Sequence, residues 1–162
     1  MSDKTYIPEG EVPPSSQIGA TLETLADTIA ARRDAGEESY TNRLLTGSPD
    51  EVLKKVMEEA GETALAAKDV ESWACSSLAA TLAARGVDEA DELSVELPPE
   101  YDAAIDHLRY EAADVAYHLL VVLERYGIGL DEFAAELNSR MTETERPQGG
   151  AKLYDNHVKR GK

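Results

Sequence analysis

The chain has 162 residues, 42% of them hydrophobic, which is enough apolar material for one compact domain and excludes a wholly disordered chain. Only 6% are aromatic, so the core must consist mainly of Ala, Leu and Val, which favours helices packed on helices. The 16 basic and 32 acidic residues give a net charge of −16, which disfavours binding to nucleic acid or to an anionic membrane. A phosphorylated substrate would therefore need a metal ion to offset the repulsion. The acidity fits a high-salt habitat and simple solubility equally well.

Cysteine usage and the apolar runs indicate a cytoplasmic protein. The single cysteine, Cys75, cannot form an internal disulfide, and no Cys/His pattern of a zinc site is present. Met1 to Glu11 lacks the apolar centre of a signal peptide. The longest strongly apolar run, Leu119 to Leu123, is too short to span a bilayer.

The amino-terminal third of the chain predicts a tail, a helix and a connector. Residues 1–19 are rich in Pro, Gly and Ser and predict a flexible tail. Residues 20–34 have apolar side chains at helical spacing, and Gly36 ends that helix. Residues 37–47 then form a polar connector with two apolar anchors, Leu44 and Leu45.

A second helix has a clear start signal. Ser48 is a suitable N-cap, Pro49 suits the first turn, and Glu51 completes a capping box. We expect this helix to end near Lys68. Residues 70–99 then predict a surface insertion that contains a helix over 73–85, an acidic run over 88–92 and two prolines at its end.

Two more helices complete an all-α fold. The patterns predict a long helix from about Tyr101 to Tyr126, ended by Gly127, and a shorter helix over 130–141. Residues 142–162 predict a second flexible tail. The domain is therefore expected to span 20–141 as a helical bundle of four to five helices.

Carboxylates on two otherwise apolar helices are the most informative feature. Glu59 and Glu62 are spaced i, i+3 on one helix, and Glu111 and Asp114 have the same spacing on another. If the two helices pack antiparallel, the four carboxylates can face one another. Buried like charges are very costly unless their pKa values rise or divalent cations bind between them. Four hard oxygen ligands suit Mg²⁺ or Mn²⁺.

Some of these residues also have simpler explanations. Glu58 alone is most simply a solvated residue paired with Lys54, and Lys55 can pair with Glu59 in the same way. His118 is better explained as a core histidine than as a ligand. A ferritin-like di-metal bundle needs Glu-x-x-His pairs, and no histidine of this chain has a Glu three residues before it.

Three blocks of sequence, in order, resemble a known family. Residues 58–62 (Glu-Glu-Ala-Gly-Glu) with residues 111–114 (Glu-Ala-Ala-Asp) resemble the paired signature of the all-α, MazG-like NTP pyrophosphatases. Residues 39–45, 53–68 and 110–121 are, within that superfamily, similar to the phosphoribosyl-ATP pyrophosphatases of histidine biosynthesis. The connector of residues 63–110 is much longer than is usual in this family.

The resemblance implies an activity and a set of roles. It implies Mg²⁺-dependent hydrolysis of 1-(5-phosphoribosyl)-ATP to 1-(5-phosphoribosyl)-AMP and pyrophosphate by a helical enzyme that is at least dimeric, so that two subunits complete the bundle. Glu59, Glu62, Glu111 and Asp114 would hold the metal, and Glu58 would assist catalysis with Glu59 and Glu62. Tyr40, Arg43 and Lys55 would contact the substrate.

Two alternatives remain open on the sequence alone. A house-cleaning (d)NTP pyrophosphatase of the same superfamily would use the same carboxylates, and only base and ribose contacts would distinguish it. A non-catalytic helical dimerisation module would predict no stabilisation by Mg²⁺.

Overall fold

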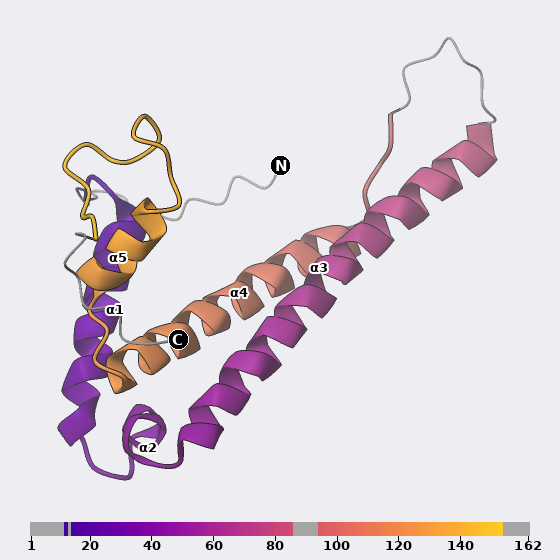
Figure 1. Ribbon diagram of the computed structural model, residues 1–162. Helices are drawn as coiled ribbons and strands as arrows, with labels where there is room; N and C mark the ends of the chain where they lie inside the picture. The colour runs from indigo at the N-terminus through magenta and orange to yellow at the C-terminus, as the bar shows by residue number, and fades with distance from the viewer. Residues whose placement is uncertain (1–11, 13, 86–93, 154–162) are drawn as a thin grey trace. The chain divides into compact units, whose positions relative to one another are not determined.

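All regular structure in the described part of the chain is helical. The computed structural model describes residues 12, 14–85 and 94–153. In chain order these residues form α1 (Gln17–Ala31), the 3-10 helix η1 (Arg32–Asp34), α2 (Tyr40–Thr46), α3 (Pro49–Arg85), α4 (Pro99–Arg125) and α5 (Leu130–Asn138) (Figure 1). The predicted all-α class is confirmed. Within the same residues, no helix is long and apolar enough to cross a membrane.

The chain divides into two compact units. One comprises Gly47–Val122, and the other comprises Met1–Thr46 together with Leu123–Lys162. The first of these contains α3 and nearly all of α4. The second contains α1, η1, α2, the last residues of α4, and α5.

Side-chain hydrogen bonds fix the helix ends in the unit that contains both termini. The hydroxyl of Ser16 caps α1 by accepting a hydrogen bond from the backbone N–H of Gly19 at 3.1 Å, so the helix begins three residues before the predicted start. The buried Asn42 amide donates to the carbonyls of Arg32 and Arg33, which joins α2 to η1.

The expected connector contains a helix. Residues 40–46 form α2, so the prediction of an irregular segment over 37–47 is wrong for these residues. Leu44 and Leu45 are only 3% exposed, which confirms them as apolar anchors. Two leucines in a seven-residue helix give too short a pattern for periodicity to identify it.

The end of α4 was predictable because a glycine terminates it. Gly127 adopts a φ of +67°, a conformation that L side chains rarely adopt. The N–H of Ile128 donates to the carbonyl of Leu123 at 2.9 Å, and the N–H of Gly127 donates to that of Glu124 at 3.1 Å. These two bonds form a Schellman motif, so the predicted stop at Gly127 is confirmed.

Helix α3 is much longer than expected. It starts at Pro49, as predicted, and the hydroxyl of Ser48 accepts a hydrogen bond from the N–H of Asp50 at 3.3 Å. The predicted end near Lys68 is wrong, because the helix continues without interruption to Arg85. Residues 69–72 contain neither Gly nor Pro, so nothing stops the helix there. The expected helix over 73–85 is therefore the second half of α3.

Some expectations fall outside the described residues. These are most of the amino-terminal tail, the acidic run over 88–92 and the last nine residues of the carboxy-terminal tail. The expected flexibility of both tails and the role of the insertion over 70–99 stay predictions.

Candidate metal centre

Two matching rows of buried residues bring the acidic side chains together. On α3 the buried residues are Val52, Glu59 and Ala66, and on α4 they include Ala104, Glu111 and His118. Each row has a spacing of seven residues, so its members lie on one face of the helix. A glutamate stands in the middle of each row.

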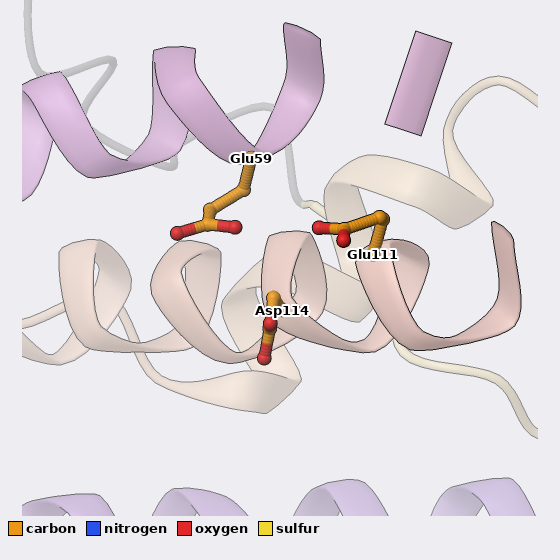
Figure 2. Close-up of side chains that lie close together, drawn as sticks. All are labelled: Glu59, Glu111 and Asp114. Atoms are coloured by element: carbon orange, nitrogen blue, oxygen red, sulfur yellow. The ribbon is translucent and has the colours of Figure 1, made fainter. Parts of the chain in front are cut away.

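Three carboxylates from the two helices converge. Glu59 reaches from α3 toward α4, and Glu111 points toward it from α4, with Asp114 one turn further along (Figure 2). One oxygen from each of these residues lies within 4.8 Å of the others. Glu59 and Glu111 are 6% and 7% exposed, and Asp114 is half-buried. α3 and α4 run antiparallel here (Figure 1), which is the condition under which the carboxylates of the two helices can face one another.

Glu62 lies near this group but is not part of the converging set. Its side chain is exposed, whereas the other three are at least partly buried. The pKa of Glu62 is raised, first by desolvation and then by the negative charges of Glu59 and Glu111. The negative charges of Glu59 and Glu111 thus disfavour ionisation of Glu62, an effect that a bound cation would offset.

Glu58 differs from its neighbours because two lysines neutralise it. Its oxygens lie 3.1 Å from the Nζ of Lys54 and 3.0 Å from the Nζ of Lys55. These hydrogen bonds, that of Lys55 first, lower the pKa of Glu58. Lys55 also lies 3.5 Å from Glu59 Oε1, so it contacts carboxylates in this structure.

Two histidines lie beside the carboxylates on α4. His118 is 5% exposed, and its Nδ1 lies 2.9 Å from the carbonyl oxygen of Asp114 and 3.8 Å from Glu59 Oε1. The expectation of a core histidine bonded to a neighbour fits this position. His107 is exposed, and its Nε2 lies 2.9 Å from Glu111 Oε1.

Sequence reasoning missed the contact of His107 with Glu111. The sequence signal for this contact was the i, i+4 spacing of His107 and Glu111 on one helix. That spacing is common on solvated helix faces, and it becomes informative only when Glu111 proves to be buried.

The two other expected site residues lie on α2, in the unit that contains both termini. Arg43 donates hydrogen bonds to the carbonyls of Glu37 and Glu38 at 3.0 and 3.3 Å. Its guanidinium carbon lies 5.8 Å from the centre of the Tyr40 ring, a cation–π contact. The Tyr40 side chain is 42% exposed. Arg43 thus orders the turn before α2 and contacts the aromatic ring beside it.

The donor set defines what the centre can bind. Three carboxylate oxygens are hard ligands, the type that Mg²⁺, Mn²⁺ and Ca²⁺ prefer. Two ligands of one such ion are separated by at most twice the metal–oxygen distance of about 2.0–2.6 Å. The observed separations are all within 4.8 Å, so small side-chain movements would close the set around an ion.

Comparisons with known proteins identify the family to which the chain belongs. The family model of phosphoribosyl-ATP pyrophosphohydrolase matches residues 22–141. A phosphoribosyl-ATP pyrophosphatase of Methylobacterium nodulans is 36% identical over 125 residues, which cover 76% of this chain and 86% of that protein. A second, from Dechloromonas aromatica, is 30% identical over 120 residues, covering 74% and 81%. No solved structure matches the chain.

Proposed function

Because the chain belongs to the phosphoribosyl-ATP pyrophosphohydrolase family, we propose that it hydrolyses 1-(5-phosphoribosyl)-ATP to 1-(5-phosphoribosyl)-AMP and pyrophosphate with the help of Mg²⁺. Membership of this family implies hydrolysis of phosphoribosyl-ATP in histidine biosynthesis. The observation that carries the proposal is the convergence of Glu59, Glu111 and Asp114 from two antiparallel helices, both of whose carboxylate motifs lie inside the matched residues.

The residues present fit a divalent cation. Glu59, Glu111 and Asp114 would hold Mg²⁺, or Mn²⁺ in its place, and a rotation of the exposed Glu62 side chain would bring a fourth oxygen to it. The pKa of Glu62, raised first by desolvation and then by the negative charges of Glu59 and Glu111, is consistent with this assignment. When bound, the ion would neutralise part of the polyphosphate charge and lower the pKa of an attacking water.

Glu58 is suited to orient the attacking water. Its lowered pKa keeps it ionised, so both oxygens accept hydrogen bonds at neutral pH. The same lowered pKa makes it a weak base, so orientation rather than proton removal is the role that we assign to it. In the reaction the water oxygen bonds to phosphorus, the anhydride P–O bond between the α- and β-phosphates breaks, pyrophosphate leaves, and the proton lost by the water passes to solvent.

Three cationic or aromatic side chains are proposed to bind the substrate. Lys55 would exchange its contacts with Glu58 and Glu59 for a phosphate oxygen, since an ammonium group interacts well with either anion. Tyr40 and Arg43 would act together, because they already form a cation–π contact on α2.

The organisation of the protein is also proposed here. We assign residues 17–141 to the pyrophosphatase domain, because α1 starts at Gln17 rather than at the predicted residue 20. We keep the insertion over 70–99 as a proposal, and we place the protein in the cytoplasm. Large apolar side chains remain exposed in the unit of residues 47–122, notably Met57, Leu65 and Tyr110 at 74%, 67% and 65%. We propose that a second copy of the chain covers them, since exposed apolar groups of this size favour association.

A substrate panel tests the proposed reaction. Purified protein with Mg²⁺ should release pyrophosphate from phosphoribosyl-ATP far faster than from any common NTP or dNTP. Faster release from dNTPs would favour a house-cleaning pyrophosphatase instead. A folded protein that releases no pyrophosphate from either class, and that Mg²⁺ does not stabilise, would exclude both activities.

A further inference from the structure

We propose that His107 is a positioning residue of the metal centre, which holds the carboxylate of Glu111 toward Glu59. The proposal rests on the proposed role of Glu111 as a metal ligand. Its basis is the 2.9 Å contact between His107 Nε2 and Glu111 Oε1. This is the distance of a good hydrogen bond, and it joins residues one helical turn apart on α4.

The two partners of this contact differ in how far their side chains are buried. The His107 side chain is 56% exposed, whereas that of Glu111 is 10% exposed. The imidazole therefore reaches from the solvent edge of α4 to a carboxylate that has little access to water. An ionised carboxylate offers only acceptors, so Nε2 carries the proton in this contact. The neutral ring suffices for it, and the interaction does not depend on a change of charge.

The hydrogen bond leaves Glu111 able to bind a cation. Oε1 is engaged by the ring, and the remaining acceptor positions of the carboxylate stay available to a metal. His107 is not among the residues that converge within 4.8 Å in the described part of the chain, which places it beside the ligands rather than among them. Partners of ligating carboxylates orient them, and their loss typically weakens metal binding by about 10–100-fold.

Glu59 has a different kind of support. Its Oε1 lies 3.5 Å from Lys55 and 3.8 Å from the Nδ1 of His118, which are longer contacts than the His107–Glu111 bond. The hydrogen bond of His118 at 2.9 Å goes to the backbone carbonyl of Asp114 instead. Within the described residues, His107 is thus the histidine whose short contact reaches a carboxylate of the converging set directly.

Direct measurement of metal binding tests this role without substrate. The affinity for Mg²⁺ and for Mn²⁺ would be measured by calorimetry on the wild type, His107→Ala, His107→Gln and the control Arg109→Ala. Arg109 is 54% exposed and pairs with Asp106 on the same helix, so it matches His107 in exposure and position. Circular dichroism of the metal-free proteins would verify that each variant is folded.

The expected result separates hydrogen bonding from general effects on the helix. His107→Ala should weaken metal binding by about 10–100-fold. His107→Gln should restore most of the affinity, because its amide can donate the same bond, and Arg109→Ala should bind like the wild type. In turnover assays, His107→Ala should need more Mg²⁺ for half-maximal rate but reach the wild-type kcat at saturation.

Two results would overturn the role of His107. One is equal affinity in His107→Ala and the wild type, and the other is a His107→Gln variant as weak as His107→Ala. If the wild type itself bound no divalent cation, the proposed metal centre would fail as a whole. The outcomes for His107 and for the proposed function are therefore distinguishable.

Discussion

The carboxyl group of Glu62 is the one near the centre whose pKa is raised among the described residues. It is exposed, yet desolvation and the charges of Glu59 and Glu111 raise its pKa above the ordinary value of 4.5. Glu58, four residues earlier on the same helix, has a lowered pKa because Lys55 and Lys54 bind it. Neutralising Glu62 should therefore stabilise the metal-free protein, whereas neutralising Glu58 should destabilise it.

Removing the charge of Glu62 should stabilise the metal-free protein. A raised pKa means that the folded state binds more protons than the unfolded state just above pH 4.5, so this group lowers stability as pH rises through its folded pKa. In thermal melts with chelator, Glu62→Gln should therefore melt above the wild type at pH 7, and the difference should shrink as pH falls toward 4.5. With Mg²⁺ the order should reverse. Glu58→Gln is the control, and a rise in its Tm at pH 7 like that of Glu62→Gln would contradict this interpretation.

Glu58→Gln should impair turnover more than metal binding. If Glu58 orients the water, its loss should lower kcat by about 10²-fold while the Mg²⁺ affinity changes little. Steady-state kinetics and calorimetry would measure the two quantities. Lys54→Gln is a suitable control, because Lys54 is 76% exposed and loses only a surface pair with Glu58. A Glu58→Gln enzyme with wild-type kcat would contradict the assigned role.

At the scale of elements, the strength of local signals decided what the sequence could predict. Ser48 with Pro49 and the glycine at 127 are strong boundary signals, and the structure confirms both boundaries. Residues 69–72 carry no stop signal, so composition alone suggested a break in α3 that does not exist. The i, i+3 pairs predicted that four carboxylates converge between antiparallel helices, and the structure brings three of them together, without Glu62. The exposure of Glu62 depends on side-chain directions that spacing does not determine.

The second half of α3 should be dispensable for catalysis. Ala79 is an exposed residue about five turns beyond Glu62, so Ala79→Gly should cost about 1 kcal/mol in the free energy of unfolding through helix propensity alone. Urea unfolding would measure that cost, and the kcat on phosphoribosyl-ATP should be unchanged. A marked fall in kcat for a variant that is still folded would show that this half of the helix takes part in the reaction.

At the scale of the whole molecule, acidity and exposed apolar surface coexist. The net charge of −16 favours solubility, whereas Met57, Leu65 and Tyr110 expose apolar area next to the carboxylates of α3 and α4. A second copy that covers these side chains would exclude water near the centre. Assembly and catalysis would then be linked.

Disrupting this surface should dissociate the proposed dimer. Leu65→Glu should shift the mass measured by light scattering from that of a dimer to that of the 17.6 kDa chain. Ala79→Glu, an exposed substitution on the same helix, should leave the mass unchanged. A wild-type protein that is monomeric at micromolar concentration would contradict the dimer.

The most direct test of the central claim is the initial rate of pyrophosphate release from phosphoribosyl-ATP, measured against Mg²⁺ concentration for the wild type and Glu111→Gln. Glu111 is 7% exposed and contributes one of the three converging oxygens, so its loss should remove a ligand without removing the helix. We expect saturable dependence on Mg²⁺ in the wild type, no activity with chelator, and a rate at least about 10²-fold lower in Glu111→Gln. Turnover that persists in chelator, or a Glu111→Gln variant with the wild-type Mg²⁺ dependence, would contradict the claim that these carboxylates hold the catalytic metal.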